Sequence, residues 1–347
     1  MKYLVKFRPL EPYTFGTDQT FQYPSGTKTG KESYFVLSGT APAQTTILGA
    51  LRYLALKQKN LLRTDFHYPD LTEVQKTIGA ESFRFPSETA QSFGVIRSVS
   101  PLFLLRGGRV LIRNPFHNRA KDAGYCPMKL TPEPVWTSHG EIRLPDADEY
   151  DAKQGYATGY IDLASKEICR NLFRFDMLPG NQKTSEVDNR AYYRRQMVRL
   201  ASDCCFAVYV DVDADAFPPE SVAYMGQKRA AFRVTAEPSD APTLETQVET
   251  AFADDSAEPW FYALSPLWVP ADTACKTFRI VEETSQRNLT TDYDAPTPVR
   301  KLKRSPVRYN LIQSGSVFYG ERPALSGDEN CRKIGYNSVV QLGGKLS

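Results

Sequence analysis

Three histidines are the residues of this chain best suited to proton transfer: His67 in TDFHYPD, His117 in NPFHNRA and His139 in TSHGE. None lies in an HxxxH or HExxH spacing, so the sequence predicts no histidine metal site. A metal-independent ribonuclease could use one histidine as a general base beside a lysine or arginine that stabilises the phosphorane. Three scattered histidines define no such constellation, and loop histidines without a catalytic role are the favoured interpretation.

Two acidic clusters, DADEYD (146–151) and DVDADAF (211–217), invite a metal interpretation. Both lack the glycine and the terminal glutamate of a calcium loop. The second continues an expected strand into a turn, where aspartate is common. The six cysteines show neither a CxxC pair nor a zinc spacing, and phosphate-binding glycine loops and the GxSxG elbow are missing from the sequence. We therefore expect no metal, no cofactor and no enzymatic activity.

Aromatic and basic residues form a more consistent set. An expected hairpin carries side chains that could stack on bases or wedge between them: Tyr192, Tyr193, Arg194, Arg195 and Arg199. Lys228 and Arg229 follow Gly226 at an expected turn. A basic stretch at 300–308 contains no acid and could follow a phosphate backbone; it includes Arg300, Lys301, Lys303 and Arg304. Each group alone is typical of a solvated face, but their agreement favours RNA.

Composition limits the class of protein that must position these residues. The chain has 347 residues, of which 41% are hydrophobic and 24% charged, as in a soluble protein of one large or two ordinary domains. The net charge is only +3, so local patches matter more than the total charge. The first residues, MKYLVKFRPL, do not resemble a signal peptide, and no stretch approaches the length of a membrane span. We expect a cytoplasmic protein that does not bind membranes.

The first half opens with an expected strand over 2–8, in which Tyr3, Val5 and Phe7 share a face. TAPAQTTILGALRYLALKQ (40–58) predicts a helix capped by Thr45 or Thr46. Its polar start favours phosphate. SPLFLLRGGRVLIRNPF predicts a hairpin that turns at Gly107-Gly108. The rest of 60–180 is interpreted as a large insertion of strands and loops.

The second half predicts further strands. EVDNRAYYRRQMVRL and CCFAVYVDVD are expected as two successive strands, and YMGQKRAAFRVTA as a turn followed by a strand. The acidic segment 236–259 is interpreted as a linker or exposed loop. Two more strands are expected, in PWFYALSPLWV and in YNLIQSGSVFY, the latter interrupted at Gly315. Sparse helices among many strands indicate an α+β chain. The final segment, 329–347, is either a terminal strand or a glycine-flanked loop for a phosphate backbone.

Several of these segments occur in a recognisable order: QTTILGALRY, VDNRAYYRRQ followed by FAVYVDV, MGQKRAAFRV, and QSGSVFY before the glycine-flanked end. In this the chain resembles the RAMP proteins of type III CRISPR effector complexes, and among them the subunit that grips the 5′ handle of the guide RNA. No motif of this kind lies within 60–180.

The resemblance implies two tandem ferredoxin-like (RRM-type) βαββαβ domains. The first would span 1–235, with an insertion at about 60–180 and a thumb hairpin at about 186–210; the second would span 236–347. Gln44, Thr45, Thr46 and, further along, Arg52 would help to hold the handle. The glycine-flanked loop would lie against the RNA, through Gly335, Tyr336, Asn337, Gly343 and Gly344.

The resemblance also implies a function and partners. The chain would be a non-catalytic RNA-binding subunit that docks a large polymerase-like subunit and a backbone RAMP subunit. Sequence reading would be left to base pairing of the guide. Two alternatives stay open, namely a guide-processing endoribonuclease of the same superfamily and a structural scaffold with little RNA contact.

Overall fold

The computed structural model describes most of residues 1–347. Outside the described residues lie 24–32, 64–70, 87–88, 120–123, 139, 147–157, 182–191, 214, 255–258, 271–277, 292–301, 327–328 and 344–347. At 18–23, 33–34, 181, 192–193, 290–291 and 302–304 only the backbone is described. Strands dominate and helices are few, which confirms the expected mixed α+β class.

The largest sheet has the strand order β10-β9-β6-β5-β13-β1-β15-β14, with β4 also beside β13, and every pairing is antiparallel. The strands are β1 (Lys2–Pro9), β4 (Ile96–Val99), β5 (Phe103–Arg106), β6 (Arg109–Arg113), β9 (Tyr160–Asp162), β10 (Ile168–Cys169), β13 (Cys204–Val212), β14 (Glu220–Met225) and β15 (Ala230–Pro238). Tyr3, Val5 and Phe7 are buried on one face of β1, as the alternation predicted. Five strands from the expected insertion therefore belong to this sheet.

The hairpin predicted at Gly107-Gly108 is confirmed. Arg106 pairs with Arg109 across a two-residue turn, and both glycines have positive φ, +55° and +86°. Positive φ at both central residues is the requirement of the type I′ turn that matches strand twist.

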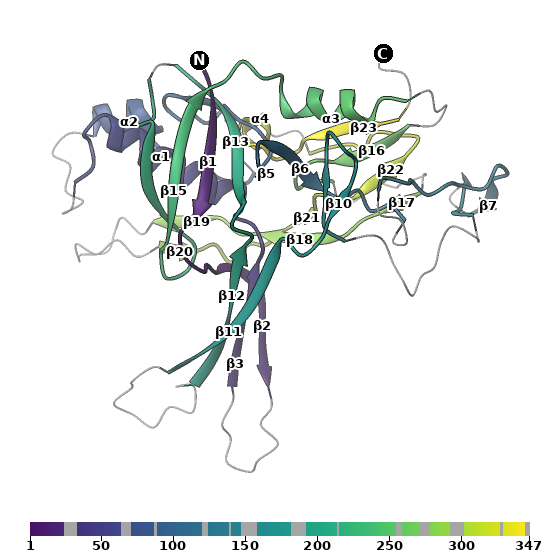
Figure 1. Ribbon diagram of the computed structural model, residues 1–347, viewed down its shortest axis with the longest axis horizontal. Helices are drawn as coiled ribbons and strands as arrows, with labels where there is room; N and C mark the ends of the chain where they lie inside the picture. Colours follow the sequence, from purple (N-terminus) through teal and green to yellow (C-terminus); the bar gives the residue numbers. More distant parts are fainter. Residues whose placement is uncertain are drawn as a thin grey trace, which may run out of the picture.

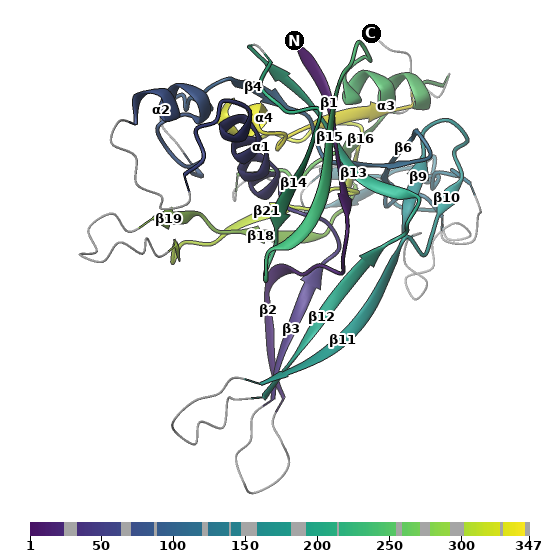
Figure 2. The ribbon, with the colours of Figure 1, turned by 60° about the vertical axis from the view of Figure 1, so that its left-hand side comes forward.

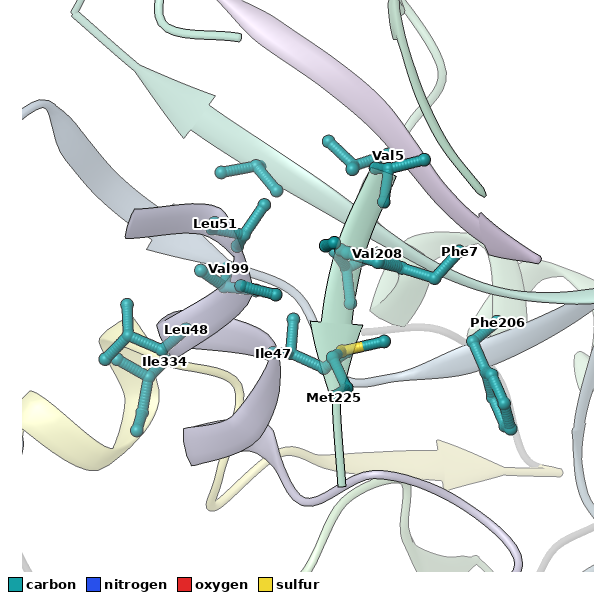
Figure 3. Packing of buried hydrophobic residues seen from close by; sticks show 14 of the residues in the cluster. Val5, Phe7, Ile47, Leu48, Leu51, Val99, Phe206, Val208, Met225 and Ile334 are labelled. Atoms are coloured by element: carbon teal, nitrogen blue, oxygen red, sulfur yellow. The ribbon is translucent and has the colours of Figure 1, made fainter. Parts of the chain in front are cut away.

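Helices α1 (Gln44–Gln58) and α2 (Thr72–Ile78) lie beside each other on one side of the sheet. Ile47 and Leu51 of α1 point at Val208 of β13 and at the other apolar side chains of the main core, as Figure 3 shows. The predicted helix is thus confirmed, but the predicted cap is not. Ala43 occupies the N-cap position, and no side chain caps the helix.

A second sheet projects from the body, with the order β11-β12-β3-β2 (Figures 1 and 2). It contains β2 (Phe15–Tyr23), β3 (Ser33–Gly39), β11 (Phe173–Asn181) and β12 (Tyr192–Leu200). β12 pairs antiparallel with β11 and parallel with β3. The strands expected within 186–210 both form, but the hairpin expected between them is wrong: β12 lies in this sheet and β13 in the main sheet. The hydrophobic contrast explains the separation, because β13 is buried along nearly its whole length whereas β12 carries exposed arginines.

A smaller antiparallel sheet has the order β17-β22-β16-β23. Its strands are β16 (Trp260–Ala263), β17 (Arg279–Ile280), β22 (Val317–Tyr319) and β23 (Val339–Leu342), and the short helix α4 (Glu329–Lys333) precedes β23. The expected strand over 309–319 is divided at Gly315, where φ is +98°, as predicted.

The acidic segment interpreted as a linker instead contains the helix α3 (Leu244–Phe252), beside β23. Thr243 caps it by accepting a hydrogen bond from the Thr246 amide. Leu244, Val248 and Phe252 form its buried face. Two of its acidic residues join the helix to the segment that contains β23: Glu245 accepts a hydrogen bond from the Ser338 hydroxyl at 2.7 Å, and Glu249 accepts one from the Gln341 amide at 3.4 Å.

Three two-stranded ribbons complete the part of the fold that the structure describes. They pair β18 (Glu283–Gln286) with β21 (Tyr309–Ile312), β19 (Leu289–Thr291) with β20 (Leu302–Arg304), and β7 (Val135–Thr137) with β8 (Gly140–Ile142). None of the helices in the described part of the chain combines the length and apolar character that crossing a membrane requires.

Candidate nucleic-acid interface

A cleft of about 1050 Å³ lies where the two larger sheets, the smaller sheet and the β18–β21 ribbon meet. Its walls come from the base of the projecting sheet (15–17), the approach to α1 and its first turn (39–46), the β14–β15 turn (226–227) and the ribbon (283–287, with Arg308 and Asn310). Arg113 of β6, Gln313 and several apolar residues, among them Phe103, also line it. The cleft therefore collects segments from both ends of the chain.

The N-terminus of α1 opens on this cleft. The first turn contains no acidic residue, and the amides of Thr46 and Ile47 both donate to the Ala43 carbonyl. A helix N-terminus carries partial positive charge and spare amide donors, which favour an anion. A phosphate in the cleft would meet this end of the helix.

Gln44 and Thr45, two residues predicted to hold RNA, are fixed in place by the C-terminal segment. Gln44 is buried; its Nε2 donates to the Ser100 carbonyl at 2.9 Å, and its Oε1 has no hydrogen-bond partner within the described part of the protein. Gly335 has φ +88° and packs so closely on Gln44 and Ser100 that a Cβ would overlap both. Burial raises the pKa of the neighbouring Tyr336 phenol, while hydrogen bonding with Thr45 acts in the opposite direction.

The other predicted residues of the C-terminal segment make contacts within the protein itself. Tyr336 and Asn337 are buried, and Asn337 Oδ1 accepts from the Trp268 amide at 2.7 Å. Gly343 follows β23 and donates to the Phe252 carbonyl at 3.1 Å, outside the cleft lining. The described part of the segment thus consists of α4, a turn at Gly335 and the strand β23, and only the turn adjoins the cleft. Gly344 lies outside the described residues.

Three arginines line the cleft, Arg113, Arg287 and Arg308, and the sequence analysis selected neither Arg113 nor Arg287. The Arg113 guanidinium lies 3.2 Å from Glu282 and over the Phe116 ring, 5.1 Å from its centroid. The Gln313 amide fits between this pair with its oxygen assigned toward Arg113 and its nitrogen toward Glu282. Arg287 stands singly in its segment and Arg113 shares the strand RVLIR with Arg109, so no spacing in the sequence distinguishes either of them as a cleft residue. Arg308 ends the basic stretch 300–308 that the sequence did indicate.

The predicted residues of β12 lie on the projecting sheet, away from the cleft. Arg194 is exposed and Arg195 half-buried. Arg199 contacts Asp176 at 2.6 Å, and this hydrogen bond holds the pKa of that carboxyl below its usual range. The side chains of Tyr192 and Tyr193 lie outside the described residues.

Exposed apolar side chains on β11 accompany these arginines and were missed from the sequence. Phe175 and Met177 are 49% and 41% exposed. They share a face with Arg194, because Pro179 is directly opposite Arg194 and residues alternate along a strand. Leu178, 51% exposed, points to the other face with Arg195. The alternation of apolar and charged residues in FRFDM could have indicated that Phe175 and Met177 share one face of a strand.

The remaining predicted basic residues are dispersed. Lys228 and Arg229 are exposed on the β14–β15 turn with φ +65° and +55°, next to the cleft residues Gly226 and Gln227. Arg52 points elsewhere: it donates to the Glu81 carbonyl at 2.9 Å and lies over the Phe93 ring, and burial lowers its pKa to about 10.

The basic stretch is described only in part. Lys303 and Arg304 belong to β20, of which only the backbone is described, and Arg300 and Lys301 lie outside the described residues.

His117 is fully buried in the interior. Its ring stacks on Trp260 with centroids 4.5 Å apart, and its Nε2 lies 2.8 Å from the Tyr125 hydroxyl. Burial lowers the pKa of His117 to about 3. His67 and His139 lie outside the described residues. Within the described ranges, His, Cys, Asp and Glu side chains form no group of three that could hold a metal ion.

Comparison with known proteins places these features in a family. The family model described as "CRISPR-associated protein (Cas_Cmr3)" matches residues 5–271. No curated protein matches the chain. The chain is similar to one in a cryo-EM structure of the type III-B Cmr-beta complex bound to cognate target RNA, at 14% identity and a TM-score of 0.44, with 99% of each chain covered. It is also similar to one in a crystal structure of a Csm3–Csm4 subcomplex, at 10% identity and a TM-score of 0.34, with 100% of each chain covered.

The family match spans well over half of the chain and defines a CRISPR-associated protein. The chain belongs to the Cas_Cmr3 family, and the resemblance to RAMP-type subunits of type III CRISPR effector complexes is confirmed.

Proposed function

We propose that this chain grips the 5′ handle of the guide RNA in its effector complex. The observation that carries the proposal is the composition of the cleft. The uncapped N-terminus of α1 and the guanidinium groups of Arg113, Arg287 and Arg308 line the same cavity. Helix N-termini and arginines both commonly contact phosphate oxygens, and a handle backbone would meet both.

We also propose that the two halves of the cleft are ferredoxin-like units. Four strands of the main sheet, in the order β5-β13-β1-β15, and the smaller sheet, in the order β17-β22-β16-β23, have the strand order and antiparallel sense of a βαββαβ unit. α1 provides the first crossover of the first unit, and α4 precedes the last strand of the second. In the chain order of the first unit, the strand β14 stands where a βαββαβ unit has its second helix, and it extends the sheet beside β15. Residues of both units line the cleft, such as Phe103 of β5 and Leu264, which directly follows β16.

The projecting sheet supports a second contact, with the guide beyond its handle. Phe175 and Met177 offer exposed apolar surface beside Arg194. Aromatic and guanidinium groups on a sheet stack on bases without reading their sequence. This arrangement fits a thumb formed by β11 and β12, at 173–200 rather than 186–210. Sequence recognition then belongs to base pairing of the guide.

The proposal includes protein partners and a non-catalytic role. A large polymerase-like subunit and a backbone RAMP subunit would bind the chain in the complex. A ribonuclease of this superfamily would need an accessible general base, and His117, the histidine that the structure describes, is buried.

The test is to incubate the purified chain with labelled guide-repeat RNA in EDTA and to examine both mobility shift and cleavage on a gel. The expected result is a shift without cutting. The double variant Arg287→Ala/Arg308→Ala should weaken binding by about tenfold or more, because two phosphate contacts are lost. The control Arg97→Ala/Arg233→Ala removes the same charge from exposed pairs outside the cleft lining. Cutting would favour the endoribonuclease; neither shift nor cutting would favour the scaffold.

A further inference from the structure

A β-arm, formed by residues 129–138 and 140–146, extends from the body beyond the main sheet. The Asp146 amide donates to the Lys129 carbonyl at 3.1 Å and the Thr131 amide to the Leu144 carbonyl at 2.8 Å. The pairing continues through β7 and β8, from Val135 opposite Ile142 to Thr137 opposite Gly140. β7 is at the far end of the molecule in Figure 1. Neither strand pairs with any other strand of the described chain.

The base of the arm is anchored to the protein. Leu130 packs on the second hydrophobic cluster, which contains Trp260 and Phe252. Arg143 donates to the Tyr319 hydroxyl at 3.3 Å. The arm is therefore held in a defined direction while its tip stays uncovered.

The tip presents Trp136, whose side chain is 77% exposed, more than that of any other large apolar residue among the described ones. Val135 and Leu144 are also exposed. Tryptophan is a costly residue to leave in water and is enriched among the residues that dominate binding energy at protein interfaces. An exposed tryptophan on an anchored, protruding hairpin has the form of an interface anchor.

The charges of the arm select the kind of partner. Glu141 is directly opposite Trp136 in the β7–β8 register, whereas Glu133 is exposed lower on the arm, between Thr131 and Val135. The basic residues Lys129 and Arg143 belong to the base, where Arg143 is directed at Tyr319. The carboxylate opposite the ring repels a phosphate backbone, so stacking on RNA is disfavoured. This carboxylate complements a protein pocket rimmed by lysine or arginine.

We propose that the arm docks its tip into an apolar pocket with a basic rim on a neighbouring protein subunit of the effector complex. The proposal rests on the proposed function only in so far as the chain works inside a multi-subunit assembly. It does not depend on handle binding, because the arm contributes no residue to the cleft.

The test is assembly of the complex from its co-expressed subunits, with subunit composition measured by native mass spectrometry and subunit affinity by titration. Trp136→Ala should weaken one protein–protein contact by about 30-fold or more, as expected for an interface anchor. Trp136→Phe should keep most of the affinity, and Glu141→Lys should lower it. Leu71→Ala, which truncates an exposed apolar side chain at the start of α2, is the matched control and should have no effect.

Unchanged assembly of the complex with Trp136→Ala would overturn the proposal. A Trp136→Ala complex that loses its RNA but keeps all its protein subunits would overturn it as well. Concentration-dependent self-association of the isolated wild-type chain that Trp136→Ala abolishes would also overturn it, in favour of a second copy. The handle assay separates the two proposals. Trp136→Ala should leave the RNA shift of the isolated chain intact, whereas the cleft variant Arg287→Ala/Arg308→Ala should weaken the shift and keep the arm contact intact.

Discussion

Gln44, in the first turn of α1, packs directly against Gly335 in the C-terminal segment, at the edge of the proposed RNA cleft. Both residues also adjoin the Ser100 carbonyl, to which Gln44 donates a hydrogen bond. The start of the helix is consequently positioned by residues near the other end of the chain. Two segments that were each expected to touch RNA separately instead form one wall of the cleft.

Gly335→Ala should destabilise the protein by about 3 kcal/mol or more, because the new methyl group overlaps its neighbours and the positive φ disfavours it. Gly320→Ala is a matched control: Gly320 has φ +76° but nothing near its Cβ position, so only the backbone cost of about 1 kcal/mol is expected. Urea unfolding measures both. Equal losses would show that the Gln44 contact does not constrain Gly335.

The elements that followed from the sequence were those with strong local patterns. Alternation in β1, helical spacing in α1 and the Gly107-Gly108 turn each specify a structure over a few residues. α3 was missed because its acidic composition was taken for a linker, although Thr243 and the spacing of Leu244 and Val248 indicated a capped amphipathic helix.

The cleft could not be predicted because its walls come together only in the folded chain. The parallel pairing of β12 with β3 places Arg194 opposite Phe35, and no local pattern encodes a pairing between segments so far apart. Arg113 shares its hairpin strand with Arg109, and only the fold shows that it is Arg113 that lines the same cleft as Arg308, directly before β21. Arg52 was predicted to bind RNA, and it does lie on α1, the helix that opens on the cleft. Its side chain nevertheless points away from the cleft, toward the Glu81 carbonyl.

Phe175→Ala should weaken binding of a guide that contains handle and spacer, because a stacked base contributes about 1–3 kcal/mol. Binding of the isolated handle RNA should not change. Leu178→Ala removes a similarly exposed side chain from the opposite face of β11 and serves as the control. Fluorescence titration with the two RNAs measures the difference. Equal effects of the two variants would contradict a one-sided contact.

The salt dependence of handle binding should show how many phosphate contacts the cleft arginines make. For single-stranded nucleic acid each phosphate contact contributes about 0.7 to the slope of log K against log salt concentration. Arg287→Ala/Arg308→Ala should therefore reduce the slope by about 1.4, and Phe175→Ala should leave it unchanged. Titrations over a salt series check this. A slope unaffected by the arginine variant would remove these residues from the phosphate path.

His117 should make stability depend on acid pH. Burial lowers its pKa from 6.5 to about 3 in the folded state, so between these values the unfolded state binds more protons than the folded state. Stability is then fully present above about pH 6.5 and falls as pH decreases toward 3, by at most about 1.4 kcal/mol per pH unit from this residue.

His117→Phe should flatten this dependence, although it should lower stability at pH 7 by about 1–3 kcal/mol because the Tyr125 hydroxyl loses its partner. Tyr125→Phe is the control, since it removes the same hydrogen bond and keeps the titrating ring. Urea midpoints from about pH 4 to 8 measure the slopes for the three proteins. A wild-type slope that survives in His117→Phe would assign the acid sensitivity to carboxylates rather than to the buried imidazole.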